Sequence, residues 1–199
     1  NFDRNRQELG SAIYRKIGDM ALVLCLLICE KKKRSLTIQL SRDMVVPWKL
    51  TEEQLITEAF MNTCRKMPPR LYLGNDKRTF FPYFDGILLP EEKGHPTRIA
   101  SWNFAEGRRG YLLTTTERIN GAIAFFYPGV KDILAEKMGG DYYVAFPSLH
   151  EAMIHPVACT NAGEVRASIQ HINAVYGERG MLSDKVFCYH KNRRLLQLL

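Results

Sequence analysis

The chain has 199 residues, of which 46% are hydrophobic and 25% charged, and its formal net charge is +7. This composition is too apolar for an intrinsically disordered chain, and a chain of this length can bury a core without metal or disulfide staples. We therefore expect a single folded domain over residues 1–199, or two lobes joined near residues 71–110.

The positive charge lies at the two ends of the chain. Residues 1–34 carry a net charge of +4, residues 35–184 carry −1 and residues 185–199 carry +4. Clustered positive charge attracts phosphate, anionic lipid or an acidic protein surface, and it does not choose among them.

The sequence indicates no membrane span and favours reduced thiols over a disulfide framework. The longest apolar run, residues 20–29, has ten residues, whereas a membrane-spanning helix needs about 20. Charged residues on both sides of this run are not typical of a secretory signal peptide, and we expect none in this segment. The five cysteines are odd in number and scattered, which favours reduced thiols. We therefore expect a cytoplasmic protein that makes no membrane contact.

The first expected strands form a hairpin. Residues 20–29 are apolar on both faces of a strand, as in a central strand, although their Ala and Leu content leaves a buried helix as the alternative. Residues 36–40 alternate apolar and polar side chains, which predicts a second strand. The charged residues 30–35 between them predict the hairpin tip.

A helix is expected to follow. Thr51 is the predicted N-cap and Gln54 lies three residues later, as in a capping box, while Pro68 ends the helix. Residues 71–110 are rich in Gly, Pro, Asn and Asp, which predicts a long irregular connection or an inserted hairpin.

The second half of the chain alternates strand and helix patterns. The Asn120-Gly121 pair predicts a tight turn between strands at 111–116 and 122–127. The further expected elements are a helix at 130–138, strands at 142–146 and 153–156, a helix at 163–176 and a strand at 185–189. Strand pairs that each precede one helix predict an α+β fold, with an antiparallel or mixed sheet built of β-hairpins alternating with single helices.

The segment from Ser148 to His155 resembles the zinc-protease motif, in which two histidines four residues apart share one helix face. Here His150 and His155 are five residues apart, which places them about 140° apart around a helix and on opposite faces of a strand. We therefore expect Ser148, His150 and Glu151 to close a turn after a strand.

Other catalytic motifs lack local support. Neither Cys159 nor Ser148, paired with His150 as a base, lies in a recognisable nucleophile context such as Gly-x-Ser-x-Gly. The glycine-rich phosphate-binding motifs are absent from the sequence as well. We expect no cofactor, no metal and no catalytic residue, and an enzyme that uses the His150–Glu151 neighbourhood is the third of three functional hypotheses.

Three basic segments are candidate interaction sites: the hairpin tip, a turn between two glycines and the C-terminal tail. They comprise Lys31, Lys32, Lys33, Arg34, Arg108, Arg109, Lys191, Arg193 and Arg194. Such residues could neutralise several nucleic-acid phosphates, or they could keep the hairpin tip and the sheet edges soluble.

Several short motifs carry a family resemblance. They are Ala21-Leu-Val-Leu, Leu50-Thr-Glu-Glu-Gln-Leu, Asn120-Gly-Ala, Pro147-Ser-x-His-Glu151 and Leu182-Ser-Asp-Lys-Val186. In this order they resemble an uncharacterised bacterial domain family of unknown function from anaerobic Gram-positive gut bacteria. The resemblance implies an additional N-terminal segment, which agrees with a chain that begins at Asn1 without a methionine. It implies no activity, cofactor or catalytic residue.

The leading hypothesis is a non-catalytic cytoplasmic interaction or regulatory domain that binds a protein partner. The alternative is a nucleic-acid-associated accessory protein, or an inhibitor of a nucleoprotein enzyme, that uses the basic segments at both ends of the chain. The sequence leaves the oligomeric state and the identity of the partner open.

Overall fold

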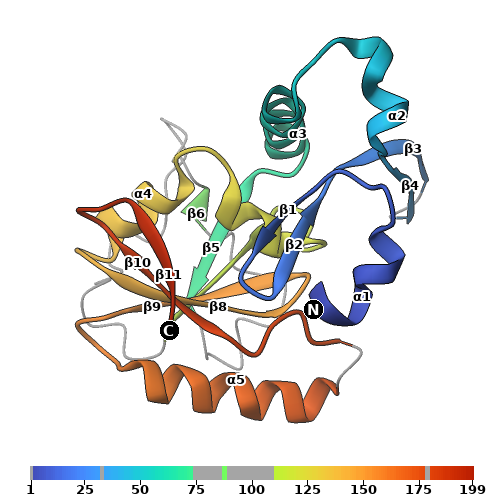
Figure 1. Cartoon of the computed structure of the whole chain (residues 1–199). Coiled ribbons are helices and arrows are strands. Elements are labelled where there is room, and N and C mark those ends of the chain that lie inside the picture. Colours follow the sequence, from blue (N-terminus) through green and yellow to red (C-terminus); the bar gives the residue numbers. More distant parts are fainter. Residues whose placement is uncertain (1, 32–33, 74–86, 89–109, 178–179) are drawn as a thin grey trace. The chain divides into compact units, whose positions relative to one another are not determined.

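The computed structural model describes the chain apart from residues 1, 32–33, 74–86, 89–109 and 178–179 (Figure 1). The chain combines helices with antiparallel sheets, so the expected α+β class is confirmed. It divides into two compact units, Asn1–Asn62 and Thr63–Leu199, and the expectation of a single domain stays a prediction. None of the described helices is long and apolar enough to cross a membrane.

Unit 1 contains two β-hairpins and the start of a long helix. Its elements are α1 (Phe2–Leu9), β1 (Tyr14–Ile17), β2 (Met20–Val23), β3 (Cys25–Lys31), β4 (Arg34–Gln39), α2 (Arg42–Val45), η1 (Val46–Trp48) and α3 (Glu52–Lys66). β1 pairs with β2, and β3 pairs with β4, each as an antiparallel two-stranded sheet. The β1–β2 turn contains Gly18 at φ +57°, a conformation that glycine adopts without steric cost.

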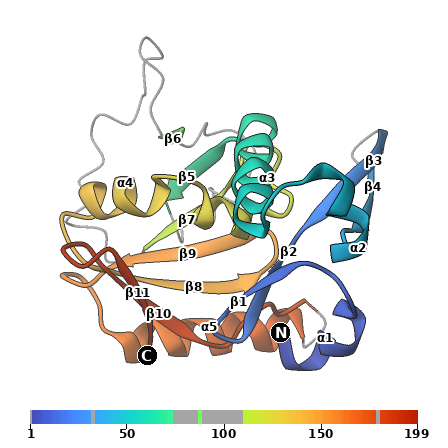
Figure 2. The same ribbon diagram turned by 45° about the horizontal axis from the view of Figure 1, so that its top comes forward.

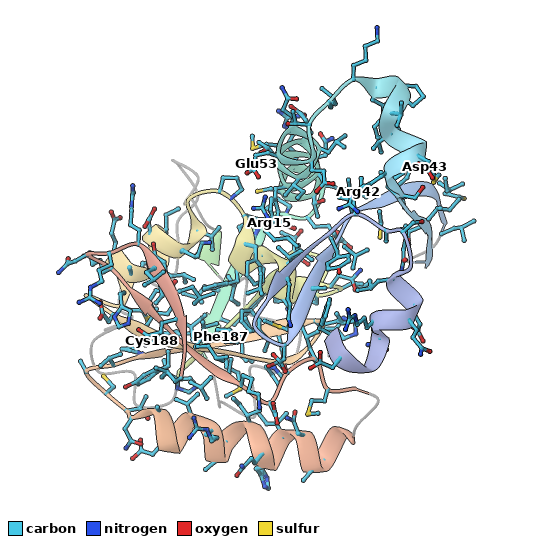
Figure 3. The ribbon with its side chains drawn as sticks, viewed as in Figure 1. Arg15, Arg42, Asp43, Glu53, Phe187 and Cys188 are labelled. Carbon is cyan, nitrogen blue, oxygen red and sulfur yellow. The ribbon has the colours of Figure 1, made fainter. Side chains whose placement is uncertain are left out.

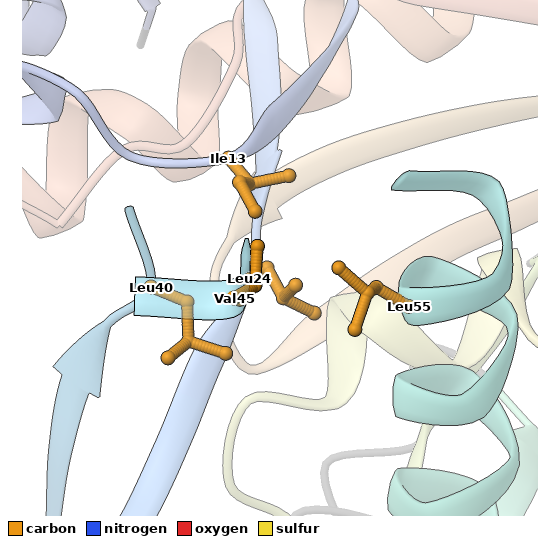
Figure 4. Packing of buried hydrophobic residues seen from close by; sticks show 5 residues of the cluster. All are labelled: Ile13, Leu24, Leu40, Val45 and Leu55. Carbon is orange, nitrogen blue, oxygen red and sulfur yellow. The ribbon is translucent and has the colours of Figure 1, made fainter. Parts of the chain in front are cut away.

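The core of unit 1 includes one cluster of five buried aliphatic side chains (Figure 4): Ile13, Leu24, Leu40, Val45 and Leu55. Ala59, one turn further along α3 from Leu55, packs against this cluster. Phe2, Leu9, Ala12 and Met20 are buried as well, whereas the apolar side chains of the β3–β4 hairpin are largely exposed.

The start of α3 is fixed by the capping box expected from the sequence. The Thr51 N–H donates to Gln54 Oε1 at 2.8 Å, and the Gln54 N–H donates to Thr51 Oγ1 at 3.2 Å. Arg15 of β1 forms an ion pair with Glu53 in the first turn of the helix (Figure 3). Local sequence chemistry therefore determines where this helix begins.

Unit 2 is built on one antiparallel sheet. Its elements are β5 (Pro69–Leu73), β6 (Ile87–Leu88), β7 (Tyr111–Thr115), η3 (Gly121–Phe126), α4 (Val130–Lys137), β8 (Tyr142–Ser148), β9 (Glu151–Pro156), α5 (Ala162–Tyr176), β10 (Val186–His190) and β11 (Leu195–Leu198). The strand order is β11-β10-β8-β9-β7-β5-β6, and each pairing in this order is antiparallel.

Helices cover both faces of this sheet. On one face, Val165 and Ile169 of α5 belong to the same buried cluster as Ala145 of β8. On the other face lie η3 and α4 (Figure 2), and the Phe125 ring of η3 meets Phe146 of β8 edge-on at 5.4 Å. Because both faces are covered, β8 is buried along almost its whole length.

The prediction that residues 20–29 form one central strand is wrong. The segment forms two strands, β2 and β3, that belong to separate two-stranded sheets. The break occurs at Leu24, whose N–H donates to the Ile13 carbonyl at 2.9 Å and whose carbonyl accepts from the Leu40 N–H at 2.9 Å. The expected hairpin with the strand at 36–40 is confirmed as β3–β4.

The expected strand at residues 122–127 is also wrong, because the chain enters the 3-10 helix η3 there. Asn120 adopts a left-handed φ of +52°, and Gly121 lies so close to the His150 carbonyl that a Cβ would approach its oxygen to 2.2 Å. The glycine thus permits a close backbone approach and not a hairpin turn. Apolar periodicity alone does not separate a short buried strand from a helix.

The elements expected at 130–138, 142–146, 153–156, 163–176 and 185–189 are confirmed within two residues at each end. The sequence predicts a basic tail where β11 lies, and its patterns do not predict α1, β1, α2, η1 or β5. Of the irregular connection expected at 71–110, residues 74–86 and 89–109 lie outside the described residues.

The packing of α5 predicts a clear difference between two of its residues. Ile169→Ala should lower the free energy of unfolding by about 2–5 kcal/mol, because Ile169 is fully buried. Val175→Ala is the matched control: its side chain is 71% exposed, and its loss should stay within about 0.5 kcal/mol. Urea unfolding followed by circular dichroism measures both, and similar losses would contradict the described packing of α5.

Candidate functional site

The β3–β4 hairpin in unit 1 has one predominantly apolar face. Leu26 pairs with Ile38 and Cys29 pairs with Leu36, so these four side chains share a face, which we call the hairpin apolar face. The alternation of apolar and polar residues along β4 places Thr37 on the opposite face. A register shift between Leu27 and Cys29 marks a β-bulge, a feature that redirects side chains.

The hairpin apolar face lies in water. Leu26, Leu36 and Ile38 are 40%, 60% and 45% exposed. Among the described residues, β3 and β4 pair only with each other, so neither strand is completed by a third. Exposed apolar side chains continue along the chain at Met44, Val46 and Trp48 in α2 and η1. Exposed apolar residues gathered in one small unit are typical of an interaction surface.

The sequence that connects β3 to β4 is basic. Lys31 pairs with Arg34 at the ends of β3 and β4, and their side chains are not described. Lys32 and Lys33 lie between them and outside the described residues, as do Arg108 and Arg109. The hairpin therefore combines an apolar face with a sequence of four consecutive basic residues.

The candidate turn residues lie between β8 and β9. Ser148 is paired with Glu151, and Ser148 Oγ accepts a hydrogen bond from the His150 N–H at 3.1 Å. His150 Nδ1 accepts from the Asn120 N–H at 3.2 Å, and the His150 carbonyl accepts from Thr114 Oγ1 at 2.6 Å. Burial raises the pKa of the Glu151 carboxyl. These contacts attach the turn to β7 and to the start of η3.

His150 and His155 do not converge on a common site. His150 lies in the turn, whereas His155 lies in β9 and is 8% exposed. His155 Nε2 makes no hydrogen bond within the described part of the chain, and burial lowers the pKa of this imidazole to about 4. Gly110 lies directly against the His155 ring, where a Cβ would come within 2.3 Å of it.

The basic residues near the C-terminus lie in the β10–β11 turn beside two carboxylates. Arg194 forms an ion pair with Asp132 at 2.9 Å, and the backbone N–H of Lys191 donates to Asp141 Oδ1 at 2.9 Å. Hydrogen bonds with His190 and with the Lys191 N–H lower the pKa of Asp141, and the charge of Arg193 contributes least to this shift. Part of the positive charge that the sequence places at this end is therefore compensated within unit 2.

Sequence analysis missed one group of polar residues beside this turn. Asp141, Cys188 and His190 each place one atom that can bind a metal within 4.8 Å of the others. Cys188 and His190 are two residues apart in β10 and therefore lie on the same face of the strand, a spacing that is visible in the sequence. Asp141 lies far away in sequence, and the pairing of β8 with β10 brings it to the same place.

The burial of His155 predicts a pH-dependent loss of stability. Between pH 6.5 and pH 4 an unfolded His155 binds a proton that the folded one does not, so the free energy of unfolding falls as the pH is lowered through this window. The total loss is about 3 kcal/mol. His155→Asn should remove this part of the pH dependence in urea unfolding, and His171→Asn, on the exposed side of α5, should retain it. Equal pH profiles for the two variants would contradict a buried neutral imidazole.

Comparison with known proteins places the chain in a family. No curated protein and no solved structure matches it. A family model described as a family of unknown function (DUF5688) matches residues 1–191, which is nearly the whole chain. The match brings no activity, ligand or partner with it. The chain belongs to DUF5688, a family of unknown function.

Proposed function

We propose that this protein is a non-catalytic cytoplasmic interaction domain that binds another protein through the hairpin apolar face. The proposed occupant is an extended segment of the partner, apolar at alternate residues and acidic at one end. Binding would add this segment as a further strand to β3 or β4, a mode in which main-chain hydrogen bonds give affinity and side-chain contacts give specificity.

The exposure of Leu26, Leu36 and Ile38 on a two-stranded sheet carries the proposal. An isolated hairpin is marginally stable in water, and its open edges are templates for a further strand. Completing the burial of half-exposed Leu and Ile side chains is worth about 1 kcal/mol for each. A partner strand would satisfy the open edge, and its apolar side chains would lie beside those of the hairpin apolar face and shield them from water.

The positive charge of the hairpin indicates that the partner segment carries negative charge. Lys31 and Arg34 are paired at the end of the hairpin, and Lys32 and Lys33 stand between them in the sequence, so an acidic flank on the bound segment would complement this charge. The Arg194–Asp132 ion pair favours a protein partner over nucleic acid, because the second basic segment is partly compensated. The free thiols of Cys25 and Cys29, both exposed, support a reducing compartment such as the cytoplasm.

A displayed library of random peptides, selected on the full chain, tests the proposal. Selected peptides should alternate apolar and polar residues and carry Asp or Glu at one end. Leu36→Thr/Ile38→Thr keeps strand-forming residues but removes apolar area, so it should weaken binding of a selected peptide by about 10- to 30-fold in fluorescence anisotropy.

The matched control exchanges side chains on the opposite face of the same strand. Thr37→Gln/Gln39→Thr should change the dissociation constant by less than about twofold. The proposal fails if no peptide is enriched over selection on Leu36→Thr/Ile38→Thr, or if selected peptides bind that variant equally well. It also fails if the chain instead binds heparin in a salt-dependent manner that requires Lys31 and Arg34, which would favour the nucleic-acid hypothesis.

A further inference from the structure

At the end of β10, three side chains of different chemistry lie together in unit 2. Cys188 and His190 project from one face of β10 (Figure 3 shows Cys188), and Asp141 immediately precedes β8. Each supplies one ligand atom, and these atoms lie within 4.8 Å of one another. Thiolate sulfur, imidazole nitrogen and carboxylate oxygen form a donor set typical of zinc.

Each ligand-type side chain is positioned by its neighbours. Asp141 uses Oδ1 to accept from the Lys191 N–H at 2.9 Å, which leaves Oδ2 beside His190 Nδ1 at 2.8 Å. His190 Nε2 lies 3.1 Å from Gln197 Oε1. Cys188 is 5% exposed and pairs with Gln197 of β11 on the neighbouring strand. Such outer contacts orient ligands in metal sites.

His190 Nδ1 lies directly beside the Asp141 carboxylate. Nδ1 is 2.8 Å from Asp141 Oδ2, and Nε2 is 3.1 Å from the side-chain amide of Gln197. Because a side-chain amide can present either its oxygen or its nitrogen to a ring nitrogen, the contact with Gln197 is compatible with either tautomer of His190. In the tautomer that carries its hydrogen on Nε2, the lone pair of Nδ1 is directed toward Asp141, and Nδ1 and Oδ2 can bind one metal ion together.

We propose that Asp141 Oδ2, Cys188 Sγ and His190 Nδ1 bind one divalent transition-metal ion of the zinc type. This inference concerns unit 2 and does not depend on the proposed function of the hairpin apolar face. Three protein ligands leave a fourth tetrahedral position for water or an exogenous ligand. The side chains of His190 and Asp141 are 25% and 40% exposed, so an ion can reach them from solvent.

The geometry needs only small side-chain adjustments. Zinc bonds of about 2.0–2.3 Å place tetrahedral ligand atoms about 3.3–3.7 Å apart. His190 Nδ1 and Asp141 Oδ2 must therefore separate by about 0.5 Å, and Cys188 Sγ must approach by about 1 Å at most. The bound ion would join the start of β8 to the β10–β11 pair, two parts of the sheet that come from distant regions of the sequence.

The charges around the site set the proton balance of binding. Burial and the negative charge of Asp141 raise the pKa of the Cys188 thiol, so the ion must displace its proton to bind sulfur. In the adjacent turn, the charge of Arg193 acts on Asp141 and opposes the ion's charge, while Arg194 is paired with Asp132. Binding should therefore release protons and strengthen as the pH rises.

Titration of the purified, metal-free full chain with Zn²⁺, and separately with Co²⁺, tests the proposal. We expect one equivalent of Zn²⁺ to bind with proton release in calorimetry, and Co²⁺ to produce a thiolate charge-transfer absorption band. His190→Asn and Cys188→Ala should each weaken Zn²⁺ binding by more than about 100-fold. Gln197→Leu keeps all three ligands but frees His190 Nε2, and should weaken binding by about 10- to 100-fold.

The controls remove the same residue types elsewhere. Cys159→Ala and His171→Asn should leave Zn²⁺ binding unchanged, and Cys25→Ser/Cys29→Ser should do the same for the exposed thiols of unit 1. Circular dichroism checks that each variant folds, and His190→Asn and Gln197→Leu carry the test if Cys188→Ala does not. Absence of Zn²⁺ binding, unchanged binding in His190→Asn, or loss of binding in Cys25→Ser/Cys29→Ser would overturn the proposal.

Discussion

A two-stranded β-sheet has no second layer of its own with which to cover an apolar face. In unit 1 the buried cluster around Leu24 and Leu55 lies beside the point where β3 begins, and it covers none of Leu26, Leu36 or Ile38. The seven-stranded sheet of unit 2 differs in this respect, because α5 covers one face and η3 and α4 cover the other. We therefore expect the interaction surface in unit 1, where the β3–β4 sheet has only two strands and its apolar face is uncovered.

Where structure depends on neighbours in sequence, the sequence predicted it well. The capping box of Thr51 and Gln54 located the start of α3, and apolar spacing with Gly177 beyond the last turn located α5. Alternation along residues 36–40 predicted the strand β4, although the sequence analysis did not identify its apolar face as a surface. These signals act over a few residues, so no knowledge of the remaining fold was needed.

Where structure depends on distant contacts, the sequence was not sufficient. The break at Leu24 arises from backbone hydrogen bonds to Ile13 and Leu40, and no local residue marks it. The Asn120-Gly121 pair indicated a hairpin, but its glycine serves the close approach of the His150 carbonyl. The Asp141–Cys188–His190 group exists only because β8 pairs with β10. The basic residues were visible in the sequence, but the compensation of Arg194 by Asp132 was not.

Amide hydrogen exchange of the full chain, with and without a selected acid-flanked peptide, tests most directly whether the hairpin is completed by a partner strand. A bound strand should protect backbone amides within Cys25–Lys31 or Arg34–Gln39, because their open edge becomes hydrogen-bonded. Amides of the sheet in Thr63–Leu199 should exchange as before. Protection confined to Thr63–Leu199, or no protection in either strand at saturating peptide, would contradict the proposed role of the hairpin apolar face.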